Sequence, residues 1–378
     1  MKTETVLANA RLVLEDRVHH GCILIRDGLI ADISGPTSLG EDMEGDHLIP
    51  GLVELHTDHL ESHYAPRPMV RWAPDAAVQA HDAQIAASGI TTVFDALRIG
   101  MDQDGDIDIN DMLALAVSIG RLNAADRLRA DHHLHLRCEV SASDCAEGFA
   151  RFADVPLVRL ASLMDHAPGQ RQFARIEAYS VYYQGKLKMS DDAFALFCAR
   201  RVAESEANSA LNRDIVSRHC RQRGIVLASH DDATFEHVRE AEALGTRVAE
   251  FPTTLEAAKA SRDAGMAVLM GAPNVIRGAS HSGNVSAREL AGEGCLDILS
   301  SDYIPFSLLH AAFFLDSAVE AIELPDAVNM VSRNPALAAG LDDRGVLKPG
   351  KRADIVRVRA DESVPLVRAV YRQGRRVA

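Results

Sequence analysis

Short apolar runs recur through the middle of the chain, separated by longer stretches in which apolar residues follow a helical period. This alternation predicts parallel strands joined by crossover helices. Eight such units within about 280 residues predict an α/β fold, a (β/α)8 TIM barrel. The expected strands cover residues 52–58, 90–97, 132–140, 157–166, 224–231, 246–252, 266–273 and 296–303.

Local signals support the helices between these strands. Thr253 and Glu256 have the spacing of a capping box, and Gly265 is the expected C-terminal stop of that helix. The interval 167–223 is too long for one loop and one short helix. We therefore expect an excursion there, followed by a long helix over about residues 191–221.

The two ends of the chain have a different sequence pattern, in which short predicted strands are separated by turn residues. Because both ends share this pattern, we expect one composite small β domain from residues 1–49 plus 345–378, and a barrel domain from residues 50–344. The expected terminal strands are 5–14, 22–26, 29–33, 353–359 and 366–371, with a hairpin signal at Asp27-Gly28.

Composition narrows the class of protein. The 378 residues carry 54 Asp+Glu against 40 Lys+Arg, a formal net charge of −14, which argues against nucleic acid or an anionic membrane as partner. The six cysteines form no C-x-x-C pair, which favours free thiols in a reducing compartment. The first apolar stretch is broken by Asn9 and Arg11, unlike a signal peptide or membrane span. We expect a soluble cytoplasmic enzyme, with the number of subunits, including a homo-oligomer, left open.

Residues with metal-ligand chemistry stand at the ends of five of the predicted strands. In a barrel these ends meet at one rim, so the side chains are expected to converge on divalent cations while leaving a position open for water. We expect two ions, zinc first, with manganese or iron as alternatives. The candidate metal ligands are His56, Asp58, Glu139, His166, His230 and Asp302.

The expected arrangement follows from strand geometry. His56 and Asp58 share one face of the first strand and would hold one ion with Asp302 beside it. His166 and His230 would hold the other ion, and Glu139 is the candidate bridging carboxylate.

Other histidines are weaker candidates. His59 and His63 could approach the site, although loop polarity explains them equally well. His132, His133 and His135 begin or line the third strand, where a structural role is favoured.

The motif PGLVELHTD from Pro50, with the closing segment 342–356, resembles the amidohydrolase superfamily. Longer segments are similar to one diphosphatase family within it, from the bacterial carbon-phosphorus lyase pathway of phosphonate utilisation. These segments are HTDHLESHYAPRP from His56, GITTVFDAL from Gly89, SLMDHAPGQRQF from Ser162, ASHDDAT from Ala228, AEFPTT from Ala249 and MGAPNVIRGASHSGN from Met270.

This resemblance implies hydrolysis of a ribose 5-triphosphate, a small-molecule substrate, to the 5-phosphate and pyrophosphate. Two features depart from the wider superfamily. The first motif is His-x-Asp instead of His-x-His, and no lysine ends the fourth strand to carry a bridging carbamate. Either Glu139 bridges two ions or the site holds fewer metals.

Basic residues near the strand ends fit a triphosphate substrate, because arginine binds phosphate oxygens with a fork of donors and lysine as a point charge. The excursion after the fourth strand is locally basic, and a glycine-rich segment follows the seventh strand. The candidate phosphate contacts are Arg171, Arg175, Lys186, Arg277, Ser280, His281 and, more weakly, Arg67.

The expected mechanism is attack of metal-bound water on a phosphorus atom, with Asp302 as catalytic base and pyrophosphate as leaving group. Two other hypotheses stay open from sequence. One is a metal-dependent deaminase or cyclic amidase on the same barrel, and the other is a catalytically inactive barrel that serves as an assembly partner.

Overall fold

The computed structural model describes residues 4–100, 107–168, 171, 190–278, 283–360 and 364–378. Eight strands within these residues form one parallel sheet in sequence order. A bridge between Thr57 and Asp302 brings the last strand beside the first, so the sheet curls into a nearly closed barrel. The TIM-barrel prediction is confirmed. The strands are β6 (Leu52–Thr57), β7 (Ile90–Ile99), β8 (Asp131–Glu139), β9 (Val158–Met164), β10 (Val226–His230), β11 (Val248–Glu250), β12 (Ala267–Gly271) and β13 (Ile298–Ser300).

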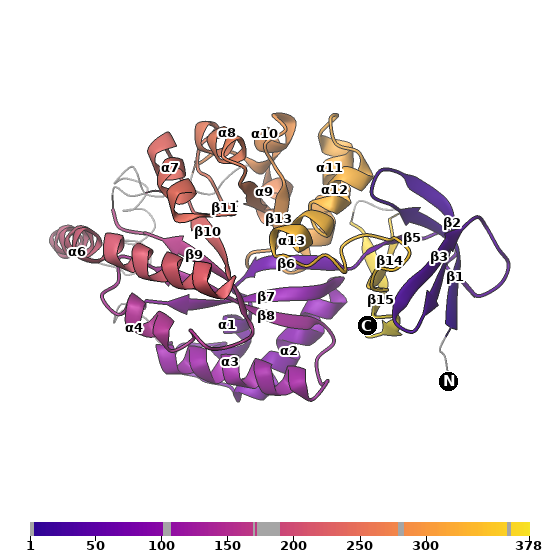
Figure 1. The fold of residues 1–378 in the computed structure, drawn as a ribbon, viewed down its shortest axis with the longest axis horizontal. Coiled ribbons are helices and arrows are strands. Elements are labelled where there is room, and N and C mark those ends of the chain that lie inside the picture. The colour runs from indigo at the N-terminus through magenta and orange to yellow at the C-terminus, as the bar shows by residue number, and fades with distance from the viewer. Residues whose placement is uncertain (1–3, 101–106, 169–170, 172–189, 279–282, 361–363) are drawn as a thin grey trace.

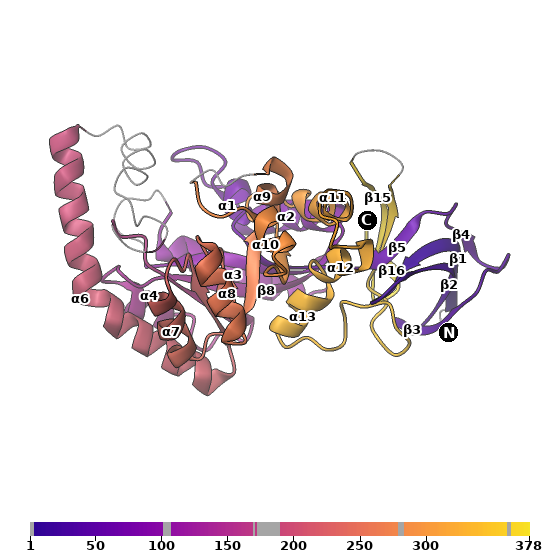
Figure 2. The ribbon, with the colours of Figure 1, turned by 90° about the horizontal axis from the view of Figure 1, so that it is seen from above.

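Helices cover the outside of this barrel (Figure 1). Most are short, and α6 is the long exception, running along one edge of the molecule (Figure 2). The helices are α1 (Leu60–Tyr64), α2 (Pro74–Ala87), α3 (Ile109–Ala124), α4 (Cys145–Ala150), α6 (Asp191–Arg223), α7 (Phe235–Leu244), α8 (Leu255–Asp263), α9 (Ala272–Arg277), α10 (Ala287–Gly292), α11 (Ser307–Ala318), α12 (Leu324–Asn329) and α13 (Arg333–Ala338).

Two helix predictions can be compared with the structure. The long helix α6 begins one residue after its cap, Ser190, and ends at Gly224, whose φ of 67° suits glycine, so the prediction of about 191–221 is confirmed. The predicted cap of α8 is off by one residue. Thr254, not Thr253, accepts the hydrogen bond from the backbone N–H of Ala257.

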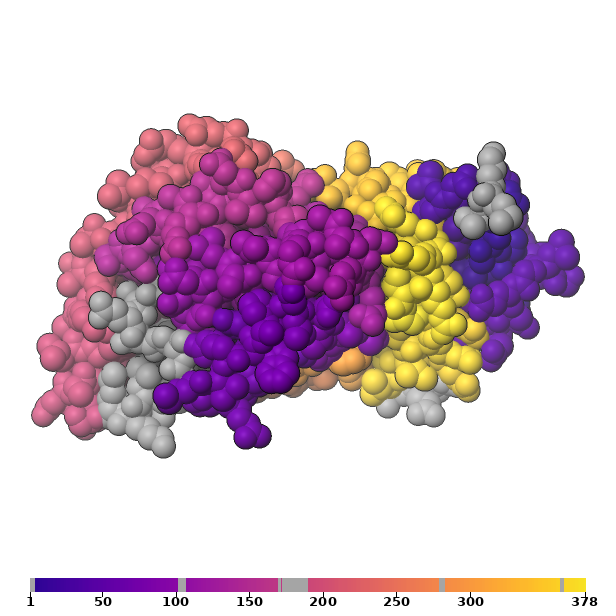
Figure 3. All heavy atoms as spheres, turned by 90° about the horizontal axis from the view of Figure 1, so that it is seen from below, coloured from indigo at the N-terminus to yellow at the C-terminus, as the bar shows by residue number. Residues whose placement is uncertain are grey.

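The two ends of the chain form a second sheet. Its order is β16-β15-β14-β5-β1-β2-β3, with β4 beside β1. The C-terminal strand β14 pairs antiparallel with β5, and in Figure 3 the C-terminal segment lies between the barrel and the N-terminal strands. The composite β unit is therefore observed, while its domain limits remain a prediction. The strands are β1 (Glu4–Val13), β2 (Val18–Arg26), β3 (Leu29–Ser34), β4 (Glu41–Asp42), β5 (His47–Pro50), β14 (Ile355–Arg359), β15 (Leu366–Arg372) and β16 (Arg375–Arg376).

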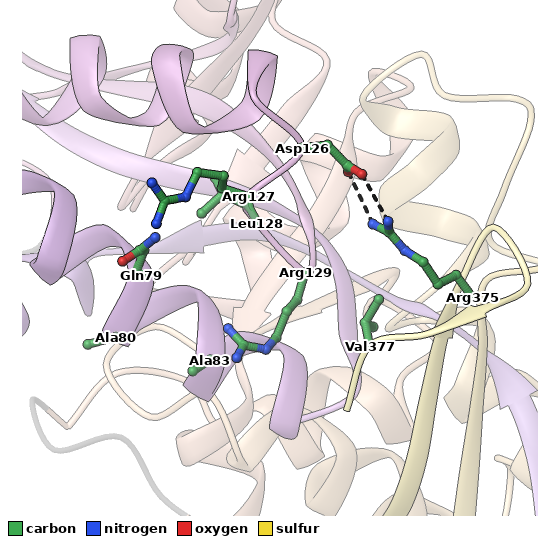
Figure 4. A pocket seen from close by; sticks show the side chains of 9 residues that line it. All are labelled: Gln79, Ala80, Ala83, Asp126, Arg127, Leu128, Arg129, Arg375 and Val377. Atoms are coloured by element: carbon green, nitrogen blue, oxygen red, sulfur yellow. Dashed lines mark hydrogen bonds and ion pairs between the residues drawn. The ribbon is translucent and has the colours of Figure 1, made fainter.

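A surface pocket marks the junction of the barrel with this sheet (Figure 4). It is lined by α2, by the segment 126–129 that precedes β8, and by the C-terminal strand. Both terminal nitrogens of Arg375 bind the carboxylate of Asp126, at 2.9 and 3.1 Å. Because this segment enters the N-terminal end of β8, the pocket lies away from the strand ends where barrels carry catalysis.

Among the described residues, no helix has the length and apolar character to cross a membrane. All six cysteines lie in the described part of the chain and are buried and unpaired, as the sequence predicts.

Candidate active site at the carboxyl ends of the strands

The described ligand candidates stand where the carboxyl ends of the barrel strands meet. His230 is the last residue of β10, and Glu139 is the last residue of β8. His166 follows β9 by two residues, and Asp302 follows β13 by two. This edge of a (β/α)8 barrel is the one that carries active sites.

One group at this edge has the geometry of a metal site. Nε2 of His166 lies 3.7 Å and Nε2 of His230 lies 3.5 Å from the same Oδ2 atom of Asp231. That oxygen is buried and has no hydrogen-bond partner among the described residues. Burial raises the pKa of Asp231 to about 7, against the lowering effect of His166. A buried carboxylate oxygen without a hydrogen bond is costly, and a divalent cation between these atoms would remove that cost.

Each of the two imidazoles is held from behind by a second carboxylate. Nδ1 of His166 lies 2.6 Å from Oε2 of Glu139, and Nδ1 of His230 lies 3.0 Å from Oε2 of Glu250. Such contacts fix the ring and its tautomer, so that Nε2 would be the atom that donates a lone pair to a metal ion. The group His166, His230 and Asp231 therefore fits a resident divalent ion.

Glu139, the carboxylate predicted to bridge two ions, lies behind His166 in this arrangement. Its Oε1 accepts hydrogen bonds from the backbone N–H of His166 and from the hydroxyl of Ser141, at 3.1 and 2.5 Å. Its Oε2 faces Nδ1 of His166. Both oxygens of Glu139 therefore contact His166 or Ser141, and its role as a bridge between two ions stays a prediction from the sequence.

His56 lies in the same cluster, on the other side of Glu250. Its Nδ1 is 3.1 Å from Oε1 of Glu250, and its ring stacks on that of His230 with centroids 5.5 Å apart. Burial lowers the pKa of His56 well below its ordinary value, so the ring is neutral. His56, His230 and Glu250 bring ligand atoms as close together as a metal site would.

Asp58 and Asp302 form a separate acidic pair around an arginine. Nη1 of Arg137 donates to Oδ2 of Asp58 at 3.1 Å. Burial, followed by the charge of Asp58, raises the pKa of Asp302 to about 7, and the charge of Arg137 opposes this rise. The predicted ion site of His56, Asp58 and Asp302 is thus not assembled at ligand distance among the described residues, and a guanidinium faces Asp58 instead.

Left-handed backbone occurs at three of these strand ends. Asp231, Phe251 and Asp302 have φ values of 58°, 53° and 54° after β10, β11 and β13. Side-chain-bearing residues adopt this region at a cost, and such strain is concentrated at functional sites. The turn at Asp231 explains how two consecutive residues, His230 and Asp231, can both reach one point.

The predicted phosphate contacts separate into three cases. Arg175, Lys186, Ser280 and His281 lie outside the described residues. Arg277, the last residue of α9, is exposed, and so is Arg67. Arg171 is buried, with a relative exposure of 4%, and forms ion pairs with Asp232 and Glu240. Because its donors are used inside the protein, the structure does not support Arg171 as a phosphate ligand.

Three functional candidates were not identified from sequence. Glu250 ends β11, so the strand-end rule that identified His230 applies to it as well. Arg137 points to the site from β8, two residues before Glu139 and on the same face of the strand. Nothing in the sequence indicated Asp231 as a ligand, because successive side chains of a strand point to opposite faces and Asp231 would then point away from His230.

A curated relative decides the family. Alpha-D-ribose 1-methylphosphonate 5-triphosphate diphosphatase of Escherichia coli (strain K12) is 47% identical over 376 residues, which cover 98% of this chain and 100% of the relative. The chain belongs to this diphosphatase family. The Amidohydrolase family model matches residues 221–378, and the resemblance predicted from the sequence motifs is confirmed.

Solved structures of low identity show the same fold as this diphosphatase family member. N-isopropylammelide isopropylaminohydrolase from Burkholderia multivorans superposes with a TM-score of 0.64 at 18% identity, covering 99% of this chain and 98% of that one. A 5-methylcytosine deaminase from Klebsiella pneumoniae gives a TM-score of 0.65 at 14% identity, with the same coverage of 99% and 98%. At these identities the likeness extends to the fold alone.

Proposed function

We propose that this protein is a metal-dependent hydrolase that cleaves α-D-ribose 1-methylphosphonate 5-triphosphate to the 5-phosphate and pyrophosphate in phosphonate catabolism. The observation that carries the proposal is the 47% identity to the E. coli diphosphatase across 98% of this chain. The convergent group at the strand ends supports it, because a hydrolase of this kind needs a place to activate water.

His166, His230 and Asp231 would hold one divalent ion. Two imidazoles and a carboxylate suit zinc best, with manganese or iron as alternatives. An ion bound there supplies a water molecule whose pKa is lowered toward ~7. Since Arg137 faces Asp58, we propose one ion at this edge in place of the two expected from sequence.

Asp302 is the proposed catalytic base. Its raised pKa, about 7, lets the carboxylate accept a proton from the attacking water near neutral pH. Arg137 lies beside both Asp302 and Asp58, where its positive charge offsets theirs. It would hold the acidic pair in place while a polyanionic substrate approaches.

The triphosphate would be bound by cationic side chains around the site. Arg277 and Arg67 are the described candidates, and both are exposed. Arg175, Lys186, Ser280 and His281 remain candidates by sequence alone. Arginine forks and hydroxyl donors would offset the charge on the phosphoryl oxygens.

A reducing, cytoplasmic location is part of the proposal. Six buried cysteines without a disulfide are typical of proteins kept in a reducing compartment. The acidic net charge of −14 supports a small-molecule partner over nucleic acid.

The test is phosphorus NMR of the products formed from a ribose 5-triphosphate in oxygen-18 water. We expect a 5-phosphate and pyrophosphate in equal amounts, with the isotope in one of them according to the phosphorus attacked. Three equivalents of orthophosphate would contradict the proposal. An unreacted triphosphate, with ammonia released from a pyrimidine or opening of a cyclic amide, would favour the deaminase or amidase hypothesis. No turnover of any of these by zinc-loaded protein would favour the inactive barrel.

A further inference from the structure

His166 and Asp231, two of the candidate metal ligands, lie beyond the paired part of their strands. The parallel pairing of β9 with β10 ends where Leu163 faces Ser229, and both candidate ligands come later in the chain. The hydrogen bonds between the two strands therefore do not by themselves set the distance between these side chains. Other contacts help to set it, and they come from α6 and α7 on the outside of the barrel (Figure 1).

The residue that precedes His166 is held by one face of the long helix α6. Oδ2 of the buried Asp165 accepts hydrogen bonds from the hydroxyls of Ser205 and Ser209, both at 2.8 Å. The same oxygen accepts from Nη2 of Arg213 at 3.3 Å. Because these three donors are spaced four residues apart, they lie on one face of the helix. Together they hold the Asp165 carboxylate, and with it the backbone that leads into His166.

The carboxylate of Asp165 also spans His166 along the chain. Its other oxygen, Oδ1, accepts a hydrogen bond from the backbone N–H of Ala167 at 3.2 Å. A side chain that binds the backbone two residues further on closes a small turn. His166 is the middle residue of this turn, so a shift of Asp165 would move the imidazole relative to the rest of the site.

The residue that follows Asp231 is held in a corresponding way. Nη1 of Arg171 donates to Oδ1 of Asp232, and both side chains are buried. The backbone C=O of Asp232 accepts a hydrogen bond from the N–H of Thr253 at 2.9 Å. Each of the two candidate ligands therefore has, as its neighbour in sequence, a buried carboxylate that is paired with an arginine.

One carboxylate of α7 joins these two arginines. Nη2 of Arg171 lies 2.9 Å, and Nε of Arg213 lies 3.7 Å, from the same Oε2 atom of Glu240. Carboxylates and guanidinium groups thus alternate, and each guanidinium lies between two carboxylates. Burial, followed by the charge of Arg213, lowers the pKa of Arg171 to about 10, so this group stays charged at neutral pH.

We propose that this ionic chain sets the distance between His166 and Asp231, so that both can reach one divalent ion. The inference rests on the proposed function, in which these two side chains help to hold the ion. The members of the ionic chain would be positioning residues, which act through the ligands and do not touch the ion. In order of contact they are Asp165, Arg213, Glu240, Arg171 and Asp232.

Stability alone is a poor explanation for buried ion pairs, because the cost of removing each charge from water offsets most of its attraction to the partner. The geometry that the ionic chain fixes is a better explanation. Functional side chains need to be held within about 0.5 Å of a productive arrangement by the residues behind them. The ionic chain meets this need at both ligands, since it ends on the residue before His166 and on the residue after Asp231.

Glu240→Gln tests the centre of the ionic chain in a protein that should fold normally, because 43% of this side chain is exposed. The neutral amide leaves two guanidinium groups close together without the charge between them. We expect the dissociation constant for zinc, measured by competition with a chelator, to rise roughly 10-fold. Glu242→Gln, at an exposed position of the same helix, is the matched control and should bind zinc as the wild type does.

Asp165→Asn removes the charge that meets α6 and keeps the shape of the side chain. The dissociation constant for zinc should rise roughly 10–100-fold. In cobalt-loaded protein the visible d–d absorption bands should also change, because they report how ligands are arranged around the ion. A purely structural network would lower the free energy of unfolding of metal-free protein in both variants and leave the zinc affinity and the cobalt spectrum as in the wild type. That result would overturn the proposal.

Zinc binding is measured without the triphosphate, so this inference and the proposed function can fail separately. Suppose that Asp231→Asn loses zinc and that both ionic-chain variants bind it weakly, while the wild type does not hydrolyse the triphosphate. The positioning role then stands, and the proposed reaction is wrong. Hydrolysis by the wild type, together with normal zinc affinity in both variants, would overturn the positioning role and leave the proposed reaction intact.

Discussion

The carboxylate of Glu54 on the first barrel strand accepts a 2.5 Å hydrogen bond from the backbone N–H of Ser301, beyond the last strand. Its other oxygen accepts from the hydroxyl of Ser300 and from the backbone N–H of His56, both at 2.7 Å. Glu54 is fully buried. One side chain thus closes the barrel and fixes the backbone that carries His56 and Asp302.

Replacing Glu54 by Gln should weaken the closure of the barrel. The amide keeps the size of the side chain, but whichever way it turns it puts an N–H donor against a backbone N–H, so a buried donor loses its acceptor. We expect the free energy of unfolding to fall by about 1–3 kcal/mol, measured by urea denaturation, and kcat to fall with it. Unchanged stability and activity would show that β13 is held to β6 by other contacts.

Glu139→Gln tests the role assigned to Glu139 behind His166. Loss of the carboxylate charge makes His166 a weaker donor, so zinc affinity should fall roughly 10–100-fold. Competition with a chelator measures this affinity, and Glu147→Gln on the exposed face of α4 is the control. Activity should return in excess zinc, whereas a loss of activity that zinc does not restore would indicate a direct catalytic role.

Asp302→Asn removes the proposed base while keeping the shape of the side chain. We expect kcat to fall by about 10²- to 10⁴-fold, with the zinc content and KM little changed. Asp316→Asn, on an exposed position of α11, is the matched control. If the zinc content falls together with kcat, Asp302 is a metal ligand, as its place in the sequence first suggested.

Arg171 and Arg277 should behave in opposite ways when replaced by Met. Arg171→Met leaves Asp232 buried without its cation, so the free energy of unfolding should fall by about 3 kcal/mol. Arg277→Met should raise KM for the triphosphate and leave stability unchanged, because the side chain is exposed. Urea denaturation and steady-state kinetics on both variants decide the question. A raised KM with normal stability for Arg171→Met would restore it as a phosphate ligand.

The order of strands and helices could be predicted from the sequence because the spacing of apolar residues differs between strands and helices along almost the whole barrel. The site was predicted less completely, since rules based on alternation assume extended backbone. At Asp231 the backbone has a φ of 58° and turns the carboxylate toward Nε2 of His230, which alternation cannot anticipate. Glu250 was missed for another reason. It ends β11, a strand of three residues that the sequence predicts as residues 246–252, so Glu250 was placed inside the strand and not at its end.

The type of a residue at a strand end does not determine which other residue it contacts. Glu139 and Asp58 were correctly placed at the strand ends, but a carboxylate there can bind an ion, orient a histidine or pair with an arginine. The choice depends on contacts across strands, from His166 to Glu139 and from Arg137 to Asp58. The sequence order of two separate strands does not contain this information.

The buried His132 should make stability depend on pH above neutrality. Asp95 and Asp82 overcome the effect of burial and raise the pKa of His132 from 6.5 to about 10. Because the folded-state pKa lies above the ordinary value, this stabilisation is fully present below pH 6.5 and is lost as the pH rises through about 10. The free energy of unfolding of metal-free protein should therefore fall between pH 7 and pH 10.

Two measurements check this expectation. Nitrogen-15 NMR of histidine-labelled, metal-free protein should show one ring, that of His132, with both nitrogens protonated at pH 8. In the Asp82→Asn variant the pKa of this ring should lie closer to the ordinary value for histidine. Urea denaturation across the same pH range should show a smaller loss of stability in Asp82→Asn than in wild type, because less of the stabilisation depends on the charged ring. A neutral His132 at pH 8 would mean that burial outweighs the two carboxylates.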